Sequence, residues 1–297
     1  MKNGKTAVYN RIREIANSWI YKDMKLNDSK VDSYNYHSFF ERQTTRLDIL
    51  VMPHRLHNDL SGLAVKDKLN RSSISYQITH HRNRQNFTKC HELAHFLLEH
   101  DGYIFANQNE DTIQEIEANV FAGILLAPDI VLLGKILYHQ KTFQDILVEL
   151  EISKEALQIR LKQVLGYHTK LYDDEIAVII QNYITRKAPN DIVEALKQAE
   201  ETIINEYKAV PIPPIELINY LFKQQNIVTS IEVEELADKT FIENLKETYP
   251  NIEYNFYFDY GKTLYYIYQS DKITTEQAFK NAKNAHFNMI FQIKSPL

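Results

Sequence analysis

The stretch Phe87-Thr88-Lys89-Cys90-His91-Glu92-Leu93-Ala94-His95-Phe96-Leu97-Leu98 decides how this sequence is interpreted. Its apolar positions recur at helical spacing, and Thr88 is the expected N-cap of the predicted helix. Because residues i and i+4 share one helix face, His91 and His95 can both reach one metal ion. Glu92 lies on the flank, where its carboxylate can take a proton from a water molecule at the metal. The motif predicts metal-assisted hydrolysis, and the alternative is two surface histidines on an amphipathic helix.

A hydrolytic zinc site needs a third protein ligand and leaves its fourth position open. The chain has Leu98 where the metzincin pattern needs glycine. His100 is expected to point about 140° away from His95 on a continued helix, so it is not expected to bind the metal. A second helix, predicted from about Thr112 to Ala127, offers the next candidates.

Within that second helix, Glu115 and Asn119 are four residues apart and share a face. One of them can bind the metal while the other hydrogen-bonds a ligating histidine. Glu115 is the expected ligand, and Glu117, about 200° away around the helix, is the alternative. Glu115 could instead close a capping box with Thr112 and serve only its own helix end.

Two blocks of the sequence together resemble a known family. They are the first stretch quoted above and Glu115-x-x-Ala118-Asn119-x-Phe121-Ala122-x-x-Leu125-Leu126-x-Pro128. In residue types and spacing they resemble the ImmA/IrrE family of zinc metallopeptidases. The resemblance continues through residues 152–161, which are similar to a small helix-turn-helix-like bundle, and covers about the first 165 residues.

The resemblance implies an α+β fold with a thermolysin-like, or zincin, metallopeptidase core. It implies that His91, His95 and Glu115 bind Zn²⁺ and that Glu92 is the general base. Asn119, from its spacing to Glu115, is then the expected support of a ligating histidine. It also implies a protein substrate, a helix-turn-helix transcriptional repressor whose cleavage derepresses mobile-element or stress genes. The chain departs from the family pattern at two positions. Asn86 stands where an arginine often precedes the Phe-Thr pair, with Arg84 as a nearby substitute, and Cys90 stands where a small apolar residue is more usual.

The patterns along the chain predict three regions. We expect the metallopeptidase core at residues 1–128, the helical bundle at 129–168, and a separate C-terminal α+β domain, a sensor or docking element, at 169–297. Short strands are expected at 47–51, 63–65 and 73–78 within the core. In the C-terminal part, the Pro211-Ile212-Pro213-Pro214 run predicts a stiff linker, and Asp259-Tyr260-Gly261-Lys262 predicts a hairpin turn between tyrosine-rich strands.

Composition excludes several classes of protein. The 297 residues hold 7 glycines and one cysteine, so neither a glycine-rich phosphate loop nor a multi-thiolate zinc site can be assembled. No targeting or membrane-spanning segment is recognised, and a reducing, cytoplasmic location is expected. The net charge of -5 disfavours nucleic acid as direct partner, and Arg160 and Lys162 are too few to form a DNA-reading face.

Two rival hypotheses are kept: a regulatory protein that acts by contact without proteolysis, and direct DNA binding by the middle helices. His80 and His81 are interpreted as polar turn residues, with substrate contact as the alternative.

Overall fold

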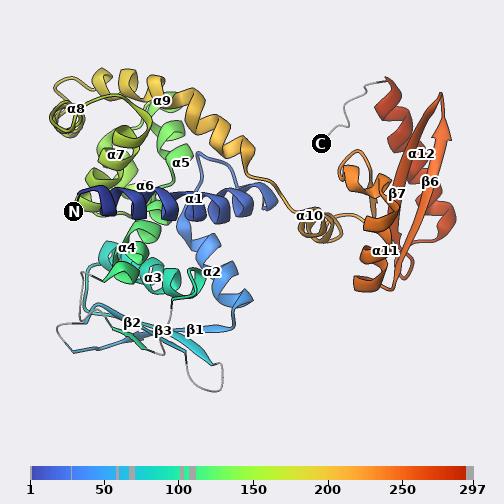
Figure 1. Ribbon diagram of the computed structural model, residues 1–297, viewed down its shortest axis with the longest axis horizontal. Helices are drawn as coiled ribbons and strands as arrows, with labels where there is room; N and C mark the ends of the chain where they lie inside the picture. The colour runs from blue at the N-terminus through green and yellow to red at the C-terminus, as the bar shows by residue number, and fades with distance from the viewer. Residues whose placement is uncertain are drawn as a thin grey trace. The chain divides into compact units, whose positions relative to one another are not determined.

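The computed structural model describes residues 2–27, 29–57, 60–66, 71–100, 104–106 and 112–291 (Figure 1). The chain divides into two compact units, Met1–Pro211 and Ile212–Leu297. The elements of the first unit are α1 (Lys2–Leu26), α2 (Tyr36–Arg46), β1 (Ile49–His54), β2 (Gly62–Lys66), β3 (Ser72–Gln77), α3 (Arg82–Leu97), β4 (Ile104–Ala106), α4 (Ile113–Leu126), α5 (Asp129–Leu133), the π-helix η1 (Gly134–Tyr138), α6 (Phe143–Glu149), α7 (Lys154–His168), α8 (Asp173–Thr185) and α9 (Asn190–Ala209). The α+β class expected from the sequence is confirmed.

A four-stranded sheet in the order β1-β3-β2-β4 forms the base of the first unit. β1 runs parallel to β3, whereas β2 is antiparallel to both β3 and β4. The three predicted strands are present, but β1 continues past Pro53 instead of ending there. Pro53 pairs with Tyr76 at the edge of the sheet, where a residue without a backbone N–H is tolerated.

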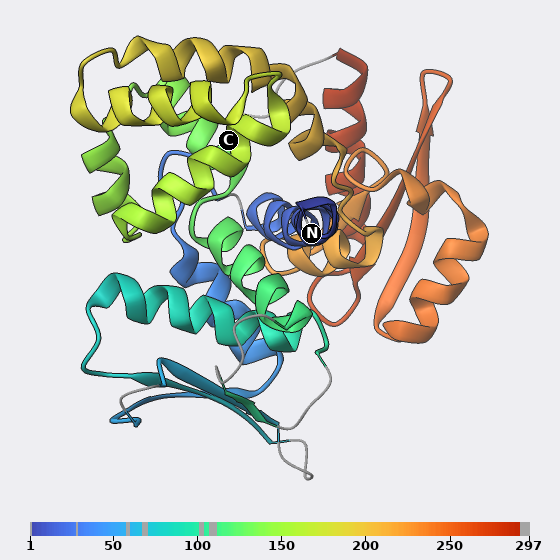
Figure 2. The ribbon, with the colours of Figure 1, turned by 60° about the vertical axis from the view of Figure 1, so that its left-hand side comes forward.

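Helix α3 lies over one face of this sheet, and α4 packs against α3 (Figure 2). Ala118 and Ala122 of α4 are fully buried, and their small side chains allow the two helices to approach closely. α3 begins at Arg82, seven residues before the predicted start, with His81 as its N-cap. The prediction of Thr88 as N-cap is therefore wrong. The polar run before it, which looked like a loop, forms the first turns of the helix.

The first unit extends further along the chain than the predicted boundary at residue 168. α8 and α9 contribute Ile176, Ile192 and Leu196 to the same hydrophobic core as α3 and α4. The division between the units falls at the proline-rich run, after Pro211. Helical amphipathicity does not tell which core an apolar face packs into, so the sequence placed these helices in the wrong unit.

The second unit has its own core and a three-stranded antiparallel sheet in the order β5-β7-β6. The predicted hairpin joins β6 to β7, and its turn residues Tyr260 and Gly261 both have positive φ, the conformation that a two-residue turn favours. The elements of this unit are α10 (Pro214–Leu221), β5 (Ile227–Thr229), the 3-10 helix η2 (Glu234–Ala237), α11 (Lys239–Thr248), β6 (Ile252–Asp259), β7 (Lys262–Gln269) and α12 (Thr275–Phe291).

One helical run, Ile113–Tyr138, is long and apolar enough by composition to cross a membrane. It comprises α4, α5 and η1, and 83% of its most apolar window is buried inside the protein. Packing in the first unit therefore accounts for its apolar character.

Candidate metal centre

His91 and His95 project from one face of α3 into the interior, with 3% and 1% of each residue exposed. Their Nε2 atoms lie 3.2 Å apart. Burial, and then the neighbouring His91, lower the pKa of His95 to about 3. His95 is therefore neutral at physiological pH, which is the form that binds a metal ion.

Glu115 on α4 supplies the third donor. Its carboxylate oxygens lie 3.1 Å from His91 Nε2 and 3.5 Å from His95 Nε2. The predicted competition with helix capping does not arise, because Thr112 accepts a hydrogen bond from the Glu115 backbone N–H at 3.3 Å and leaves the side chain available. Burial opposes ionisation of Glu115, but the hydrogen bond with His91 and the charges of the histidines lower the pKa overall.

The three donors fit a metal ion in geometry and in chemistry. With bonds of about 2.0–2.2 Å, the ligand atoms of a tetrahedral zinc ion lie about 3.3–3.6 Å from one another. The two Nε2 atoms lie 3.2 Å apart, His91 Nε2 lies 3.1 Å from Glu115 Oε2, and His95 Nε2 lies 3.5 Å from Glu115 Oε1. Two imidazoles and one carboxylate are also the donor set of several catalytic zinc sites.

Each histidine is held from behind through its Nδ1 atom. His91 Nδ1 lies 3.0 Å from Asn119 Oδ1, so the ring N–H donates to the amide oxygen. His95 Nδ1 lies 2.8 Å from His100 Nδ1. Asn119 thus occupies the supporting position expected for it, and both rings turn Nε2 toward Glu115.

Glu117, the alternative third ligand, faces away from the three donor atoms. Its carboxylate accepts a hydrogen bond from His100 Nε2 at 2.9 Å and another from Arg11 on α1. The structure therefore favours Glu115 over Glu117 as the third donor.

Glu92 lies beside the donors with 1% of its surface exposed. Its Oε2 is buried and has no hydrogen-bond partner among the described residues. Burial raises the pKa of the carboxyl well above its usual range, and the nearby Glu115 raises it further, while the backbone N–H of Ala64 opposes this. A buried acceptor without a partner is costly and is typical of a functional position.

Gly62 of β2 makes room for the Glu92 carboxylate. A Cβ atom at this position would lie 2.4 Å from Glu92 Oε1 and 2.3 Å from a methyl carbon of Thr88. Only glycine leaves this space, so the sheet and α3 approach each other closely at Glu92. Periodicity could not predict this contact, since it joins residues 30 positions apart.

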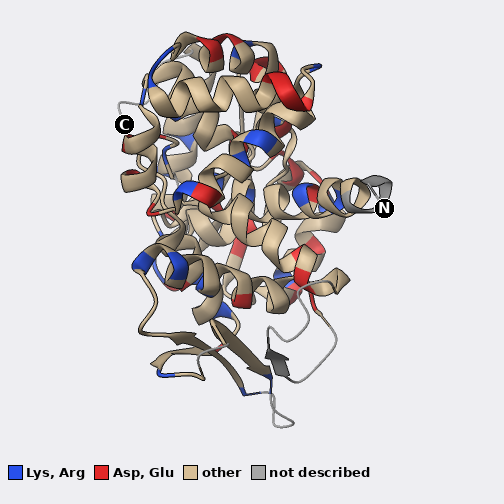
Figure 3. Ribbon diagram, turned by 90° about the vertical axis from the view of Figure 1, so that its left-hand side faces the viewer, with Lys and Arg blue, Asp and Glu red and all other residues tan. Residues whose placement is uncertain are grey.

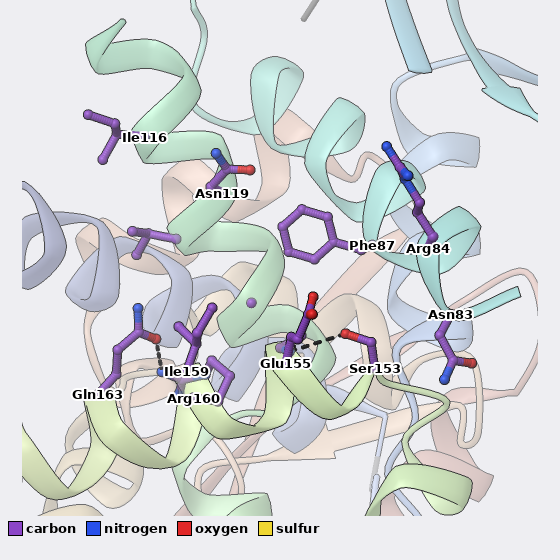
Figure 4. A pocket seen from close by; sticks show the side chains of 13 residues that line it. Asn83, Arg84, Phe87, Ile116, Asn119, Ser153, Glu155, Ile159, Arg160 and Gln163 are labelled. Atoms are coloured by element: carbon purple, nitrogen blue, oxygen red, sulfur yellow. Dashed lines mark hydrogen bonds between the residues drawn. The ribbon is translucent and has the colours of Figure 1, made fainter. Parts of the chain in front are cut away.

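A cleft of about 580 Å³ opens alongside the donors, between the first turns of α3, the outer face of α4, and α7 (Figure 4). Phe87 stands in it with its ring centroid 6.3 Å from that of His91, and Asn119 lines the same wall. Ile116, Val120 and Ile159 make the cleft largely apolar, while Arg84 and Glu155 bring opposite charges to it. The cleft and the donor cluster are thus linked through Phe87 and Asn119, both of which contact His91.

Asn86 and Arg84, at the positions that depart from the family pattern, have hydrogen-bond partners within the fold. Asn86 is buried and accepts a hydrogen bond from the Tyr36 hydroxyl at 2.7 Å, so it stabilises the fold. Arg84 lies exposed and donates to the Ser61 hydroxyl. Cys90 is buried, as expected. His80 lies in a bend, and His81, the N-cap of α3, is exposed.

His100 is not one of the three donors, but the prediction that its ring points away from His95 is wrong. It was placed on a continued helix, but α3 ends at Leu97 and Glu99 has a positive φ of 53°. This turn brings the His100 ring back against His95. Only a residue prone to the left-handed conformation at 99 could have signalled the turn, and glutamate does not.

A second group of possible metal ligands, Asp129, His168 and Glu206, lies elsewhere in the first unit. Arg13 Nε lies 2.9 Å from Asp129 Oδ2, and Arg160 bonds the other oxygen of the same carboxylate. Two guanidinium groups already balance these acids, so the group does not fit a metal ion.

Arg160 is 1% exposed and unavailable to DNA. Figure 3 shows acidic and basic residues interspersed over the helices.

An α+β fold that brings an HExxH helix and a glutamate of the next helix to one point is typical of metal-dependent hydrolases. Residues 44–162 match the family model of the IrrE N-terminal-like domain, Peptidase M78, and this segment of the chain is identified as such a domain. The resemblance to the ImmA/IrrE family is thereby confirmed, and peptidases of this family are metallopeptidases. No curated protein and no solved structure matches the chain significantly.

Proposed function

We propose that the protein is a cytoplasmic zinc-dependent endopeptidase with a zincin core. One observation carries the proposal: His91 Nε2, His95 Nε2 and the Glu115 carboxylate lie within 3.1–3.5 Å of one another. Beside them lies Glu92 Oε2, which has no hydrogen-bond partner in the part of the chain that the structure describes. A bound zinc ion supplies Lewis acidity, which polarises the scissile carbonyl and makes water more acidic. Peptide hydrolysis also needs a group that moves a proton, and Glu92 is placed for this role.

The residues around the donors transfer the proton, orient a ligand and bind the substrate. Glu92 takes up a proton from the attacking water at Oε2 and returns it to the leaving amine. Asn119 orients His91. Glu92 is buried in the interior, and bulk water is therefore kept away from its carboxylate. The cleft lined by Phe87 and Ile159 receives an apolar side chain of the substrate next to the scissile bond.

The proposed substrate is a helix-turn-helix transcriptional repressor, cleaved to derepress mobile-element or stress genes. The resemblance to the ImmA/IrrE family supports this substrate. The burial of Arg160 also weighs against DNA binding by α7, so DNA recognition would belong to the partner. The α6–α7 pair is then the helix-turn-helix-like bundle of the family and packs against the catalytic part.

The test incubates zinc-loaded protein with the repressor encoded beside its gene and follows the repressor by mass spectrometry. We expect one discrete pair of cleavage products from the wild type. Glu92→Gln should bind zinc yet cleave at least about 100-fold more slowly, because a general base contributes about 100- to 10,000-fold. Glu194→Gln, an exposed position, is the matched control. Equal inactivation of the repressor by Glu92→Gln would show that the protein acts by contact and not by proteolysis.

A further inference from the structure

A hydrogen-bonded line of side chains runs from the surface of the first unit to His95. Arg11 of α1 bonds one carboxylate oxygen of Glu117 on α4, and the other oxygen lies 2.9 Å from His100 Nε2. His100 Nδ1 in turn lies 2.8 Å from His95 Nδ1. The side chains of His100 and Glu117 are 5% and 8% exposed, whereas that of Arg11 is 57% exposed.

This line fixes which nitrogen of each ring carries a proton. A carboxylate only accepts hydrogen bonds, so His100 must donate to Glu117 from Nε2. The Nδ1 atom of a neutral His100 is then an acceptor, and His95 must donate to it from Nδ1. The lone pair of His95 is consequently on Nε2, the atom that faces His91 and Glu115.

The two histidines differ in their support. His91 is held by the neutral amide of Asn119, whereas His95 is held by an imidazole that is itself bonded to a carboxylate. A carboxylate at the end of such a line draws the proton toward it and makes the ligating nitrogen a stronger donor. The charge of the Glu117 carboxylate therefore stabilises the ligating form of His95 through His100. His91 has only the neutral amide of Asn119 behind it.

We propose that His100 and Glu117 are positioning residues for the metal ligand His95. They hold its ring in the Nδ1–H tautomer, aim Nε2 at the donor cluster and strengthen its bond to the metal. Arg11 holds the Glu117 carboxylate from the helix α1 side. This inference rests on the proposed zinc site and adds to it three residues from outside the HExxH motif.

The test measures the zinc dissociation constant of the full chain by competition with a chromophoric chelator at one fixed pH. His100→Leu removes the acceptor for His95 Nδ1 and should weaken zinc binding by about 10- to 100-fold. His100→Asn places an amide oxygen near the position of Nδ1 and should restore affinity to within about threefold of the wild type. His139→Leu, at an exposed position, is the matched control and should leave the dissociation constant unchanged.

Glu117→Gln keeps the shape of the side chain but removes its charge, and we expect about a tenfold loss of zinc affinity. Cobalt(II) absorption of each substituted site gives a second readout, since altered support of His95 shifts the ligand-field bands. Thermal unfolding of the metal-free variants separates this role from a structural one, because a purely structural role would lower stability and leave affinity intact.

Weak zinc binding by His100→Leu and Glu117→Gln, with rescue by His100→Asn, supports the positioning role. Wild-type affinity in all three variants would overturn it while leaving the zinc site itself in place. If His100→Leu does not fold, the other two variants still decide. A wild-type protein that binds no zinc would contradict the proposed function as well as this inference.

Discussion

At the scale of single residues, the candidate centre depends on side chains that their neighbours confine to one position. Glu92 has one oxygen near the Ala64 backbone N–H and one without a partner, in a space that exists because residue 62 is glycine. A buried carboxylate in this position cannot swing into water. Its placement is therefore sensitive to very small changes in the neighbouring strand.

Gly62→Ala should reduce cleavage of the repressor by about 100-fold while zinc content stays at that of the wild type. The added Cβ would lie 2.4 Å from Glu92 Oε1, and displacing a reacting group by about 1 Å can cost this much in rate. Cleavage rates and zinc content measured on the same preparations test the expectation. Gly166→Ala is the control, since its Cβ would meet only Ile176 at 3.8 Å. Equal rates for both variants would show that Glu92 is not confined by Gly62.

How much of the centre the sequence could predict depends on how local each feature is. His91, Glu92 and His95 follow from helical periodicity alone, and Asn119 follows from its spacing to Glu115. Glu115 was the expected ligand with Glu117 as the alternative, and only the packing of α4 against α3 distinguishes them. His100, Arg11 and Gly62 reach the centre through a chain turn or through packing between distant segments, and periodicity carries no information about either.

At the scale of helices and strands, a buried charge cluster ties α5 to α1 and α7 within the first unit. Asp129 at the start of α5 is bonded by Arg13 of α1 and Arg160 of α7, and His168 Nε2 lies 3.2 Å from its Oδ2. Although burial opposes ionisation, Arg160, His168 and Arg13 hold the pKa of Asp129 well below its usual range. The ionised carboxylate is therefore the form that the fold requires.

Asp129→Asn should lower the free energy of unfolding by about 3–5 kcal/mol, because it removes the counter-charge of buried Arg160 and leaves buried Arg13 with Glu206 alone. Urea denaturation at neutral pH measures the loss. Asp174→Asn, at an exposed position in the first turn of α8, is the control and should cost less than about 1 kcal/mol.

The pH dependence of this difference has a definite sign. A carboxyl with a depressed pKa in the folded state contributes stability above the pKa of the unfolded chain, and the contribution is lost as pH falls through the folded value. The gap between wild type and Asp129→Asn should be constant above about pH 5 and narrow below about pH 4. A gap that widens in acid would contradict an ionised Asp129.

At the scale of the whole chain, the two units carry separate cores. The first core ends with residues of α9, and the second begins with Ile218 of α10. The proline-rich run between them was recognised in the sequence because proline restricts the backbone on its own. The membership of α8 and α9 was predicted wrongly, since it depends on long-range packing.

A fragment of residues 1–211 should fold and bind zinc with the affinity of the full chain, because it keeps the core and all donors. A fragment of residues 1–168 should be unstable, since it lacks the buried side chains of Ile176, Ile192 and Leu196. Circular dichroism melts and zinc titrations of both fragments test this. A stable shorter fragment would place the boundary at the position that the sequence suggested.

The central claim is that His91, His95 and Glu115 together bind one zinc ion. The most direct test is a crystal structure of the zinc-reconstituted protein with an anomalous difference map at the zinc absorption edge. The account predicts one strong peak about 2.0–2.2 Å from His91 Nε2, His95 Nε2 and a Glu115 carboxylate oxygen. A map without a peak there, or with zinc at Asp129 and His168 instead, would contradict it.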